Sequence, residues 1–378
     1  MFKNQVAKPL FSIEVLRGIA VILVLFLHGR EVAWVGTKSF FLTHSLFSLP
    51  AILALLSQPF VFGSIGVPIF FVLSGYCIHR KSAFNIVKDP ANSNNYPKAL
   101  NFLFRRFIRI YPVLLGALVV TYFLDKASFT YHPVNYKLLP LTINSFLINV
   151  FALQGVLGPA FGSNGALWSL SLEIQFYLCY PFLILVRKKI GVNKTLLLIL
   201  LINIFSLLIL KKITFFTSYY FSWYLGFYIA EVRAATLFKS LSKRLVLYAG
   251  IFLILFGCVL FFTHIEFLPF NCWSLGFALY LWYLLDKEYP VNLLTKTFSF
   301  VGDMSYSLYA IHLPIFVFFM SYFYNSVKPV NISVSILFSI IIVFIAYIFY
   351  MIIEKPTIKL LSAIRMRNQI LTKKRISQ

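Results

Sequence analysis

The sequence contains little charge, and acidic residues are especially scarce. Only 12% of its 378 residues are charged, and 11 Asp and Glu stand against 34 Lys and Arg. Soluble domains usually carry about 25% charged residues. Hydrophobic residues make up 60% of the chain, and no long polar stretch interrupts them. These values exclude an ordinary soluble protein and argue against a separate domain outside a membrane.

Several common functional signatures are also missing. The sequence has no Walker phosphate loop, no dinucleotide fingerprint, no GxSxG elbow and no HExxH motif. Its first apolar run, Leu10 to His28, includes Glu14 and Arg17 and lacks a small-residue cleavage site, so it is not a cleavable signal. The four cysteines lie in apolar runs without metal-ligand spacing, so we expect packing residues and no metal or bound cofactor: Cys77, Cys179, Cys258 and Cys272.

Apolar runs near the length that spans a bilayer, about 20 residues, recur along the whole chain. The sequence therefore predicts an all-α, polytopic integral membrane protein with about ten transmembrane helices. We place them at residues 11–32, 59–79, 107–124, 167–186, 193–211, 217–233, 245–263, 268–285, 298–321 and 331–353. Two shorter apolar pieces, 45–56 and 142–157, are interpreted as interfacial or re-entrant.

The distribution of Lys and Arg predicts the orientation. With the N-terminus in the cytoplasm, 27 of these residues fall on the cytoplasmic side and 7 on the outer side. Both termini are then cytoplasmic, in the inner or plasma membrane of the cell. A transmembrane domain over 1–356 is followed by a short basic tail, 357–378. Because the basic residues sit in separate short loops, a nucleic-acid partner is not expected.

The first predicted helix carries ionisable groups at membrane depth, where they cost roughly 2.5 kcal/mol or more. Arg17 and His28 are eleven residues apart, which places them on one helix face about 16 Å apart along the axis. Histidine is suited to proton transfer near neutral pH, so His28 is a candidate base. In the alternative, Glu14 pairs with Arg17 and His28 is a satisfied polar residue near the outer interface.

The third predicted helix begins with arginines, and Arg106 and Arg109 share one face of it. Guanidinium groups suit phosphate oxygens, so a phosphate-bearing cofactor from the cytosol could dock there. Arginines that only anchor the topology are the alternative.

Two further helices carry polar groups. Glu173 has no basic partner within reach on its own helix, so it needs a partner from elsewhere or must stay protonated; a role in helix packing is the alternative. Tyr306, Tyr309 and His312 form a polar stripe on the ninth helix, where His312 taken alone suits a structural hydrogen bond.

Together these segments resemble the acyltransferase 3 family of membrane acyltransferases, which includes O-antigen and peptidoglycan O-acetylases. The matching motifs occur in the family's order and cover nearly the whole chain: Arg17 with His28, FFVLSGY at 70–76, RRFIRIYP at 105–112, WSLSLEIQFY at 168–177, SYSLYAIH at 305–312 and Glu354-Lys355-Pro356. The ten-helix count fits as well. The SGNH hydrolase-like domain of many relatives is absent from this sequence.

The resemblance implies transfer of an acyl group, usually acetyl from acetyl-CoA, to a hydroxyl of a cell-surface or lipid-linked glycan such as lipopolysaccharide. We expect His28 and Glu173 to be catalytic, with His28 as the base. The CoA phosphates would bind Arg17, Arg106 and Arg109, and the acceptor would contact Trp168, Tyr309 and His312. Direct transfer and an acyl-enzyme intermediate both stay open. A proton-coupled transporter is the rival function, although the sequence shows no paired halves with matching broken helices.

Overall fold

The computed structural model describes residues 11–42, 48–92, 95–132, 139, 141–210, 215–236, 242–263, 267–287 and 289–376. Within these ranges, regular structure consists of helices and one isolated β-bridge between Gln154 and Gly158. The predicted all-α class is therefore confirmed for the described residues. The four cysteines are free thiols.

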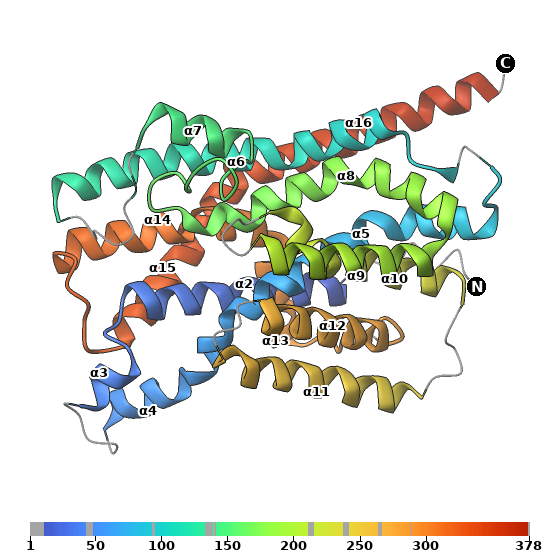
Figure 1. Cartoon of the computed structure of the whole chain (residues 1–378). Coiled ribbons are helices and arrows are strands. Elements are labelled where there is room, and N and C mark those ends of the chain that lie inside the picture. The colour runs from blue at the N-terminus through green and yellow to red at the C-terminus, as the bar shows by residue number, and fades with distance from the viewer. Residues whose placement is uncertain are drawn as a thin grey trace.

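Figure 1 shows the helices as a bundle whose long members run roughly side by side. In chain order they are α2 (Phe11–Val32), α3 (Thr37–Phe41), α4 (Leu49–Leu56), η1 (Gln58–Ile65), α5 (Gly66–Lys88), α6 (Ala99–Thr130), α7 (Ile143–Val150), η3 (Gly165–Leu167), α8 (Trp168–Ile190), α9 (Val192–Ile209), η4 (Phe216–Ser218), α10 (Tyr220–Ala234), α11 (Lys243–Phe261), α12 (Phe267–Leu284), α13 (Leu293–Asp303), α14 (Ser305–Tyr324), α15 (Ser333–Phe349), η5 (Tyr350–Glu354) and α16 (Lys355–Ile376).

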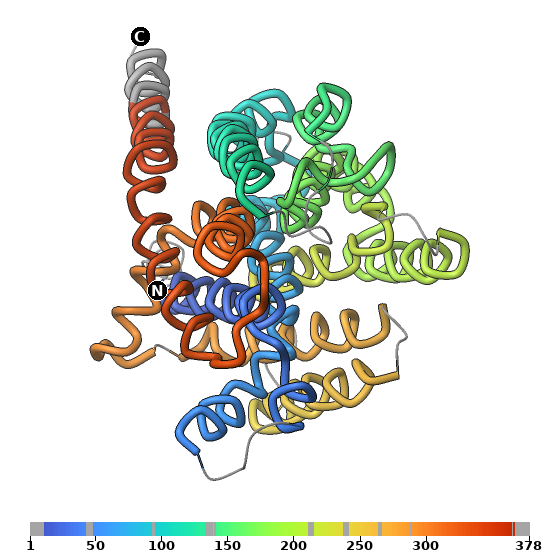
Figure 2. The backbone as a smooth tube through the Cα atoms, turned by 90° about the vertical axis from the view of Figure 1, so that its left-hand side faces the viewer, coloured from blue at the N-terminus to red at the C-terminus, as the bar shows by residue number. Residues whose placement is uncertain are grey.

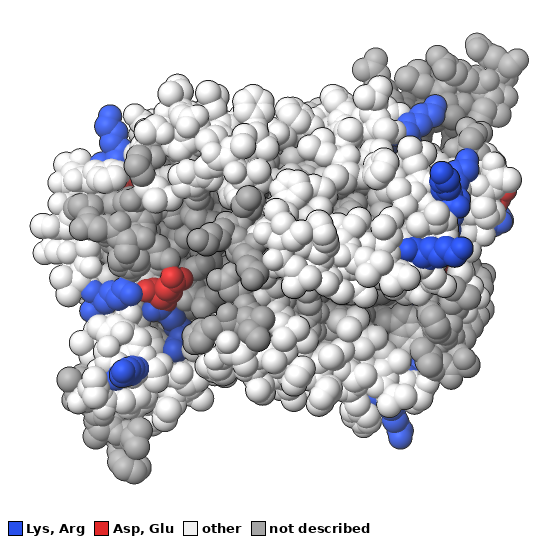
Figure 3. Space-filling view, viewed as in Figure 1, with Lys and Arg blue, Asp and Glu red and all other residues white. Residues whose placement is uncertain are grey.

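Eight helical segments of the described chain are long and apolar enough to cross a membrane. They overlap eight of the ten predicted spans, and the other two correspond to α10, with 15 residues, and α12, with 18. Figure 3 shows a face on which Lys and Arg gather at two ends, with a broad uncharged band between them. The chain is thus a multi-pass membrane protein, while the count of ten spans and the cytoplasmic termini remain predictions.

Two predicted spans differ from the helices in a way that hydropathy cannot detect. The span 298–321 is divided into α13 and α14 at Met304, whose backbone is not helical (φ −101°, ψ 10°). Met304 is itself apolar and buried, so the break leaves no trace in the apolar pattern. The span 59–79 starts in the 3₁₀ turn η1, and its helix α5 continues to Lys88. Polar residues can extend a helix beyond the apolar layer.

The two short apolar pieces contain the short helices α4 and α7.

At the C-terminal end of the described chain, α15 passes through the π-helical turn η5 into α16, so the described part of the predicted basic tail is helical. Pro356 is the second residue of α16 and directly follows the π-helical turn. In Figure 1, α2 begins and α16 ends toward the right-hand side.

The end-on view in Figure 2 places α2, α5 and α14 near the middle of the bundle. Burial agrees, since 72% of the apolar window of α14 is buried inside the protein but only 17% of that of α11.

Glycines allow central helices to touch. A Cβ on Gly75 of α5 would lie 2.0 Å from the Trp223 carbonyl of α10. The small residues of the second predicted span therefore serve close helix packing.

Candidate active site

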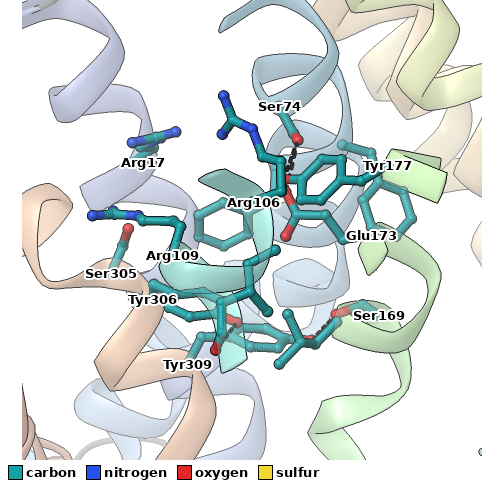
Figure 4. A pocket seen from close by; sticks show the side chains of 14 residues that line it. Arg17, Ser74, Arg106, Arg109, Ser169, Glu173, Tyr177, Ser305, Tyr306 and Tyr309 are labelled. Atoms are coloured by element: carbon teal, nitrogen blue, oxygen red, sulfur yellow. Dashed lines mark hydrogen bonds between the residues drawn. The ribbon is translucent and has the colours of Figure 1, made fainter. Parts of the chain in front are cut away.

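A cavity of about 110 Å³ lies among α2, α5, α6, α8 and α14 (Figure 4). Five of the eight predicted site residues line it, contributed by four different helices. Its polar lining consists of Arg17, Ser74, Arg106, Arg109, Ser169, Glu173, Tyr177, Ser305, Tyr306 and Tyr309. In Figure 4 the three arginines lie toward one end of the cavity, and Ser169 and Tyr309 lie toward the other.

Arg106 keeps its charge uncompensated within the cavity wall. Its guanidinium carbon lies 5.5 Å from the ring centroid of Phe102 and 5.6 Å from that of Tyr177, positions that favour cation–π attraction. Its buried Nε has no hydrogen-bond partner among the described residues, and none of their carboxylates forms an ion pair with it. Arg17, in contrast, lies 3.5 Å from Glu14, three residues before it on α2. Arg106 therefore retains donors for an anionic ligand.

Arg109 lines the cavity but is also part of a buried ion pair. Its Nη2 donates to Glu354 Oε1 over 2.9 Å, and Glu354 is fully buried. The other carboxylate oxygen accepts from the Ser307 N–H at 3.1 Å and from its hydroxyl at 2.6 Å. This arrangement joins α6, α14 and η5, and it gives Glu354 of the Glu354-Lys355-Pro356 motif a structural role, because Arg109 neutralises its buried carboxylate.

The hydrogen-bond partners of Glu173 among the described residues are two hydroxyl groups. Its Oε1 accepts hydrogen bonds from Ser74, at 2.6 Å, and from Tyr177. Trp223 donates in turn to the Ser74 hydroxyl at 3.2 Å. No described residue hydrogen-bonds to Glu173 Oε2, and the residue lines the cavity. One oxygen is thus fixed by the protein, and the second remains able to accept from a bound hydroxyl.

His28 is paired with His312 of α14. Nδ1 of His28 lies 2.7 Å from Nε2 of His312, and Nδ1 of His312 lies 2.8 Å from the carbonyl oxygen of Tyr309. A carbonyl only accepts, so His312 carries its proton on Nδ1 and its neutral Nε2 is an acceptor. His28 must then donate from Nδ1, which leaves the basic lone pair of neutral His28 on Nε2. The same hydrogen bond would persist if His28 became protonated.

Tyr309 connects this histidine pair to the cavity. Its hydroxyl lies 2.6 Å from that of Ser169 in the cavity wall. Its ring centroid is 5.7 Å from that of His312, one turn further along α14. His28 and His312 are not among the residues that line the cavity. Because His312 contacts Tyr309, the histidine pair lies next to the end of the cavity opposite the arginines.

Comparison with known proteins identifies the family. A family model described as an acyltransferase domain matches residues 10–351. The chain belongs to the acyltransferase 3 family. The match includes every residue of the site just described except Glu354, which lies three positions beyond it.

Two of the relatives that the chain matches are named O-acetyltransferases. The chain is 31% identical over 292 residues to the peptidoglycan O-acetyltransferase OatA of Listeria monocytogenes, covering 67% of this chain and 45% of that protein. It is 27% identical over 332 residues to the O-acetyltransferase OatA of Staphylococcus aureus, covering 78% and 52%. An uncharacterized protein of Haemophilus influenzae is 35% identical over 147 residues, covering 37% and 57%. The chain thus spans about half the length of these relatives. No solved structure matches it.

Trp168 is the one predicted site residue that the structure places apart from both the cavity and the histidine pair. Its half-buried ring packs on Tyr219, with 5.3 Å between ring centroids. Ser169, the next residue along α8, does line the cavity. Because successive residues on a helix point about 100° apart, the two side chains of this acyltransferase 3 motif face different neighbours.

Sequence reasoning assigned no role to His79, which is fully buried. Nε2 of His79 lies 2.8 Å from Glu231 Oε1, and Nδ1 lies 2.9 Å from the Tyr180 hydroxyl. Arg187 also donates to both oxygens of Glu231, at 2.9 and 2.7 Å. The predicted span 59–79 ends at this histidine, whereas α5 continues nine residues beyond it. This saturated network ties α5, α8 and α10 together.

Proposed function

We propose that this chain is a membrane O-acyltransferase that moves an acetyl group from acetyl-CoA to a hydroxyl of a cell-surface or lipid-linked glycan. The observation that carries the proposal is a cavity with arginines at one end, Glu173 in its wall and a histidine pair beside its other end. Membership of the acyltransferase 3 family and the O-acetyltransferase names of its relatives support it. The proposal includes the ten-span topology with both termini in the cytoplasm.

The arginine end of the cavity suits the donor. The phosphates of CoA need cations, and planar guanidinium groups bind phosphate oxygens well. Arg106 is the best placed of the three, because it has no carboxylate partner among the described residues. Arg17 and Arg109 add positive charge while remaining bound to Glu14 and Glu354.

In the net reaction, the C–S bond of the thioester breaks and a C–O ester bond forms. The proton of the acceptor hydroxyl ends on the sulfur of CoA. A sugar hydroxyl is a weak nucleophile at neutral pH and needs a base. The hydrogen bonds of the histidine pair leave the lone pair of His28 on Nε2, and we assign this nitrogen the task of taking the hydroxyl proton.

The acceptor would approach from the end where Tyr309 lies. Glu173 Oε2 can accept a hydrogen bond from a sugar hydroxyl, and the Tyr309 hydroxyl can exchange its bond to Ser169 for one to the acceptor. His312 then acts on the acceptor through His28. Trp168 would contribute an aromatic face at the start of α8, further from the reacting atoms.

The proposal is tested by the consumption of acetyl-CoA. Protein purified in detergent is mixed with labelled acetyl-CoA and an acceptor polysaccharide, and release of free CoA and labelling of the glycan are followed. Stoichiometric CoA release and ester formation are expected. A proton-coupled transporter would show neither. Loss of one O-acetyl signal from the surface polysaccharide of a deletion strain would then identify the glycan and the hydroxyl.

A further inference from the structure

A second cavity, of about 170 Å³, lies between α2, α4, η1 and the start of α15. Most of its lining is apolar, and the polar members are Arg30, Ser57 and Ser335. Arg30 follows His28 by two residues on α2, so the two side chains point about 200° apart around the helix. This cavity is therefore separate from the candidate active site.

Arg30 is a buried cation without a counter-charge among the described residues. Only 9% of its surface is exposed. It donates to the hydroxyls of Ser57 and Thr37, the latter at 3.2 Å, and its guanidinium carbon lies 4.7 Å from the ring centroid of Trp34. All three partners are neutral. Removing a cation from water without an anion nearby costs several kcal/mol. Because these neutral contacts do not compensate the charge of Arg30, an anionic ligand from outside the protein would stabilise it.

The position of Arg30 indicates where that anion would come from. Arg30 lies two residues before the end of α2, near the depth at which a membrane-spanning helix reaches the lipid headgroups. The adjoining helix α4 exposes large apolar side chains, with Leu49 70% and Leu56 68% exposed. Figure 1 shows α3 and α4 at the end of the bundle remote from the start of α2. Exposed leucines of this kind suit contact with acyl chains.

We propose that this cavity binds a glycerophospholipid, with its phosphate on Arg30 and an acyl chain along the apolar wall. The guanidinium fork matches phosphate oxygens, and basic pockets between membrane helices are known sites for lipid headgroups. The bound lipid would neutralise Arg30 and hold α4 and η1 against α2. This site does not depend on the proposed acyl transfer.

The test titrates delipidated protein, in an uncharged detergent, with dioleoylphosphatidylglycerol and counts bound lipids by native mass spectrometry. Dioleoylglycerol, which has the same chains without phosphate, and glycerol phosphate, which has the phosphate without chains, are titrated in parallel. The phospholipid should bind at least about tenfold more tightly than either, because each lacks one half of the contacts.

Two variants probe the two halves of the site. Arg30→Gln removes the cation and should weaken phospholipid binding about tenfold or more. Leu56→Trp, at an exposed position, fills the cavity and should weaken binding similarly even if the first variant fails to fold. Lys126→Gln is the matched control, since Lys126 lies 5.9 Å from the Tyr122 ring but is exposed and outside the cavity; it should bind like the parent.

Three results would overturn the proposal. Equal binding of glycerol phosphate would make this an anion site without lipid specificity. Equal binding of dioleoylglycerol would make it an apolar cleft in which Arg30 has no part. Unchanged phospholipid binding by Leu56→Trp, or by a folded Arg30→Gln, would place the lipid elsewhere.

Discussion

His28 and His312 are 284 residues apart in the sequence and share one hydrogen bond, 2.7 Å between Nδ1 of the first and Nε2 of the second. Because His312 donates its own Nδ1–H to the Tyr309 carbonyl, the pair has a single consistent arrangement of protons. In that arrangement His312 is a positioning residue for His28.

Replacing His312 by leucine should lower kcat for acetyl transfer by roughly 10²-fold while KM for acetyl-CoA stays the same. The reason is that the Nδ1–H of the partly buried His28 loses its acceptor, which costs about 1–3 kcal/mol. His312→Gln should recover much of this rate, since a glutamine carbonyl can accept from the same N–H. Initial rates of the purified variants measure the effect. A leucine variant with the parent kcat would show that His312 does not act through His28.

His28→Ala should abolish O-acylation, because loss of a general base typically costs about 10²–10⁴ in rate. Protein level and membrane insertion should be unchanged, as shown by immunoblotting of membrane fractions. His132→Ala serves as the control, since His132 is an exposed histidine. Near-normal acylation by a well-expressed His28→Ala protein would remove His28 from the mechanism.

Arg106→Ala should raise KM for acetyl-CoA and weaken inhibition by free CoA. Its guanidinium has no carboxylate partner among the described residues, so its charge is available to the donor's phosphates. Salt should weaken donor binding in the parent and have less effect in the variant, because one of the attracting charges is gone. Isothermal titration with CoA at two salt concentrations measures both. If CoA affinity is untouched, Arg106 only anchors the topology.

Arg109→Ala should mainly destabilise the protein, because it leaves the fully buried Glu354 without its cation. Breaking a buried ion pair from one side typically costs about 3–5 kcal/mol. The double variant Arg109→Leu with Glu354→Leu should melt at a higher temperature than Arg109→Ala, since no buried charge is left unpaired. Thermal unfolding in detergent tests the order. Parent-like melting of Arg109→Ala would show that the pair contributes nothing to stability.

The sequence alone predicts the all-α membrane fold, because the low charge and repeated apolar runs have one physical interpretation. It also indicates which residues gather in the cavity, since an ionisable group at membrane depth needs a partner. It does not show which partner. The Arg109–Glu354 pair spans 245 residues, and no local pattern encodes such a contact. Glu173 needs a partner from another helix or must stay protonated, and its observed partners are the hydroxyls of Ser74 and Tyr177, whereas His28 pairs with His312.

The last prediction concerns the two sides of the membrane. CoA is too polar to enter lipid, so its phosphates should remain at the arginine end of the cavity, which the predicted topology places toward the cytosol. The thioester on its flexible arm could then extend toward Tyr309 and the histidine pair. Arg17 and His28 are separated by about 16 Å along α2, so donor and acceptor could meet inside the bundle from opposite sides.

Sealed vesicles with the cytosolic face outward and a soluble acceptor glycan trapped inside test this directly. Labelled acetyl-CoA added outside should acetylate the trapped glycan without leakage, and His28→Ala vesicles should show only background label. A co-trapped fluorescent dye reports leakage in the same sample. If label reaches only glycan supplied on the same side as acetyl-CoA, transfer does not cross the membrane. The enzyme would then acylate a cytosolic-face substrate that must be flipped afterwards, and Tyr309 would close the cavity rather than admit the acceptor.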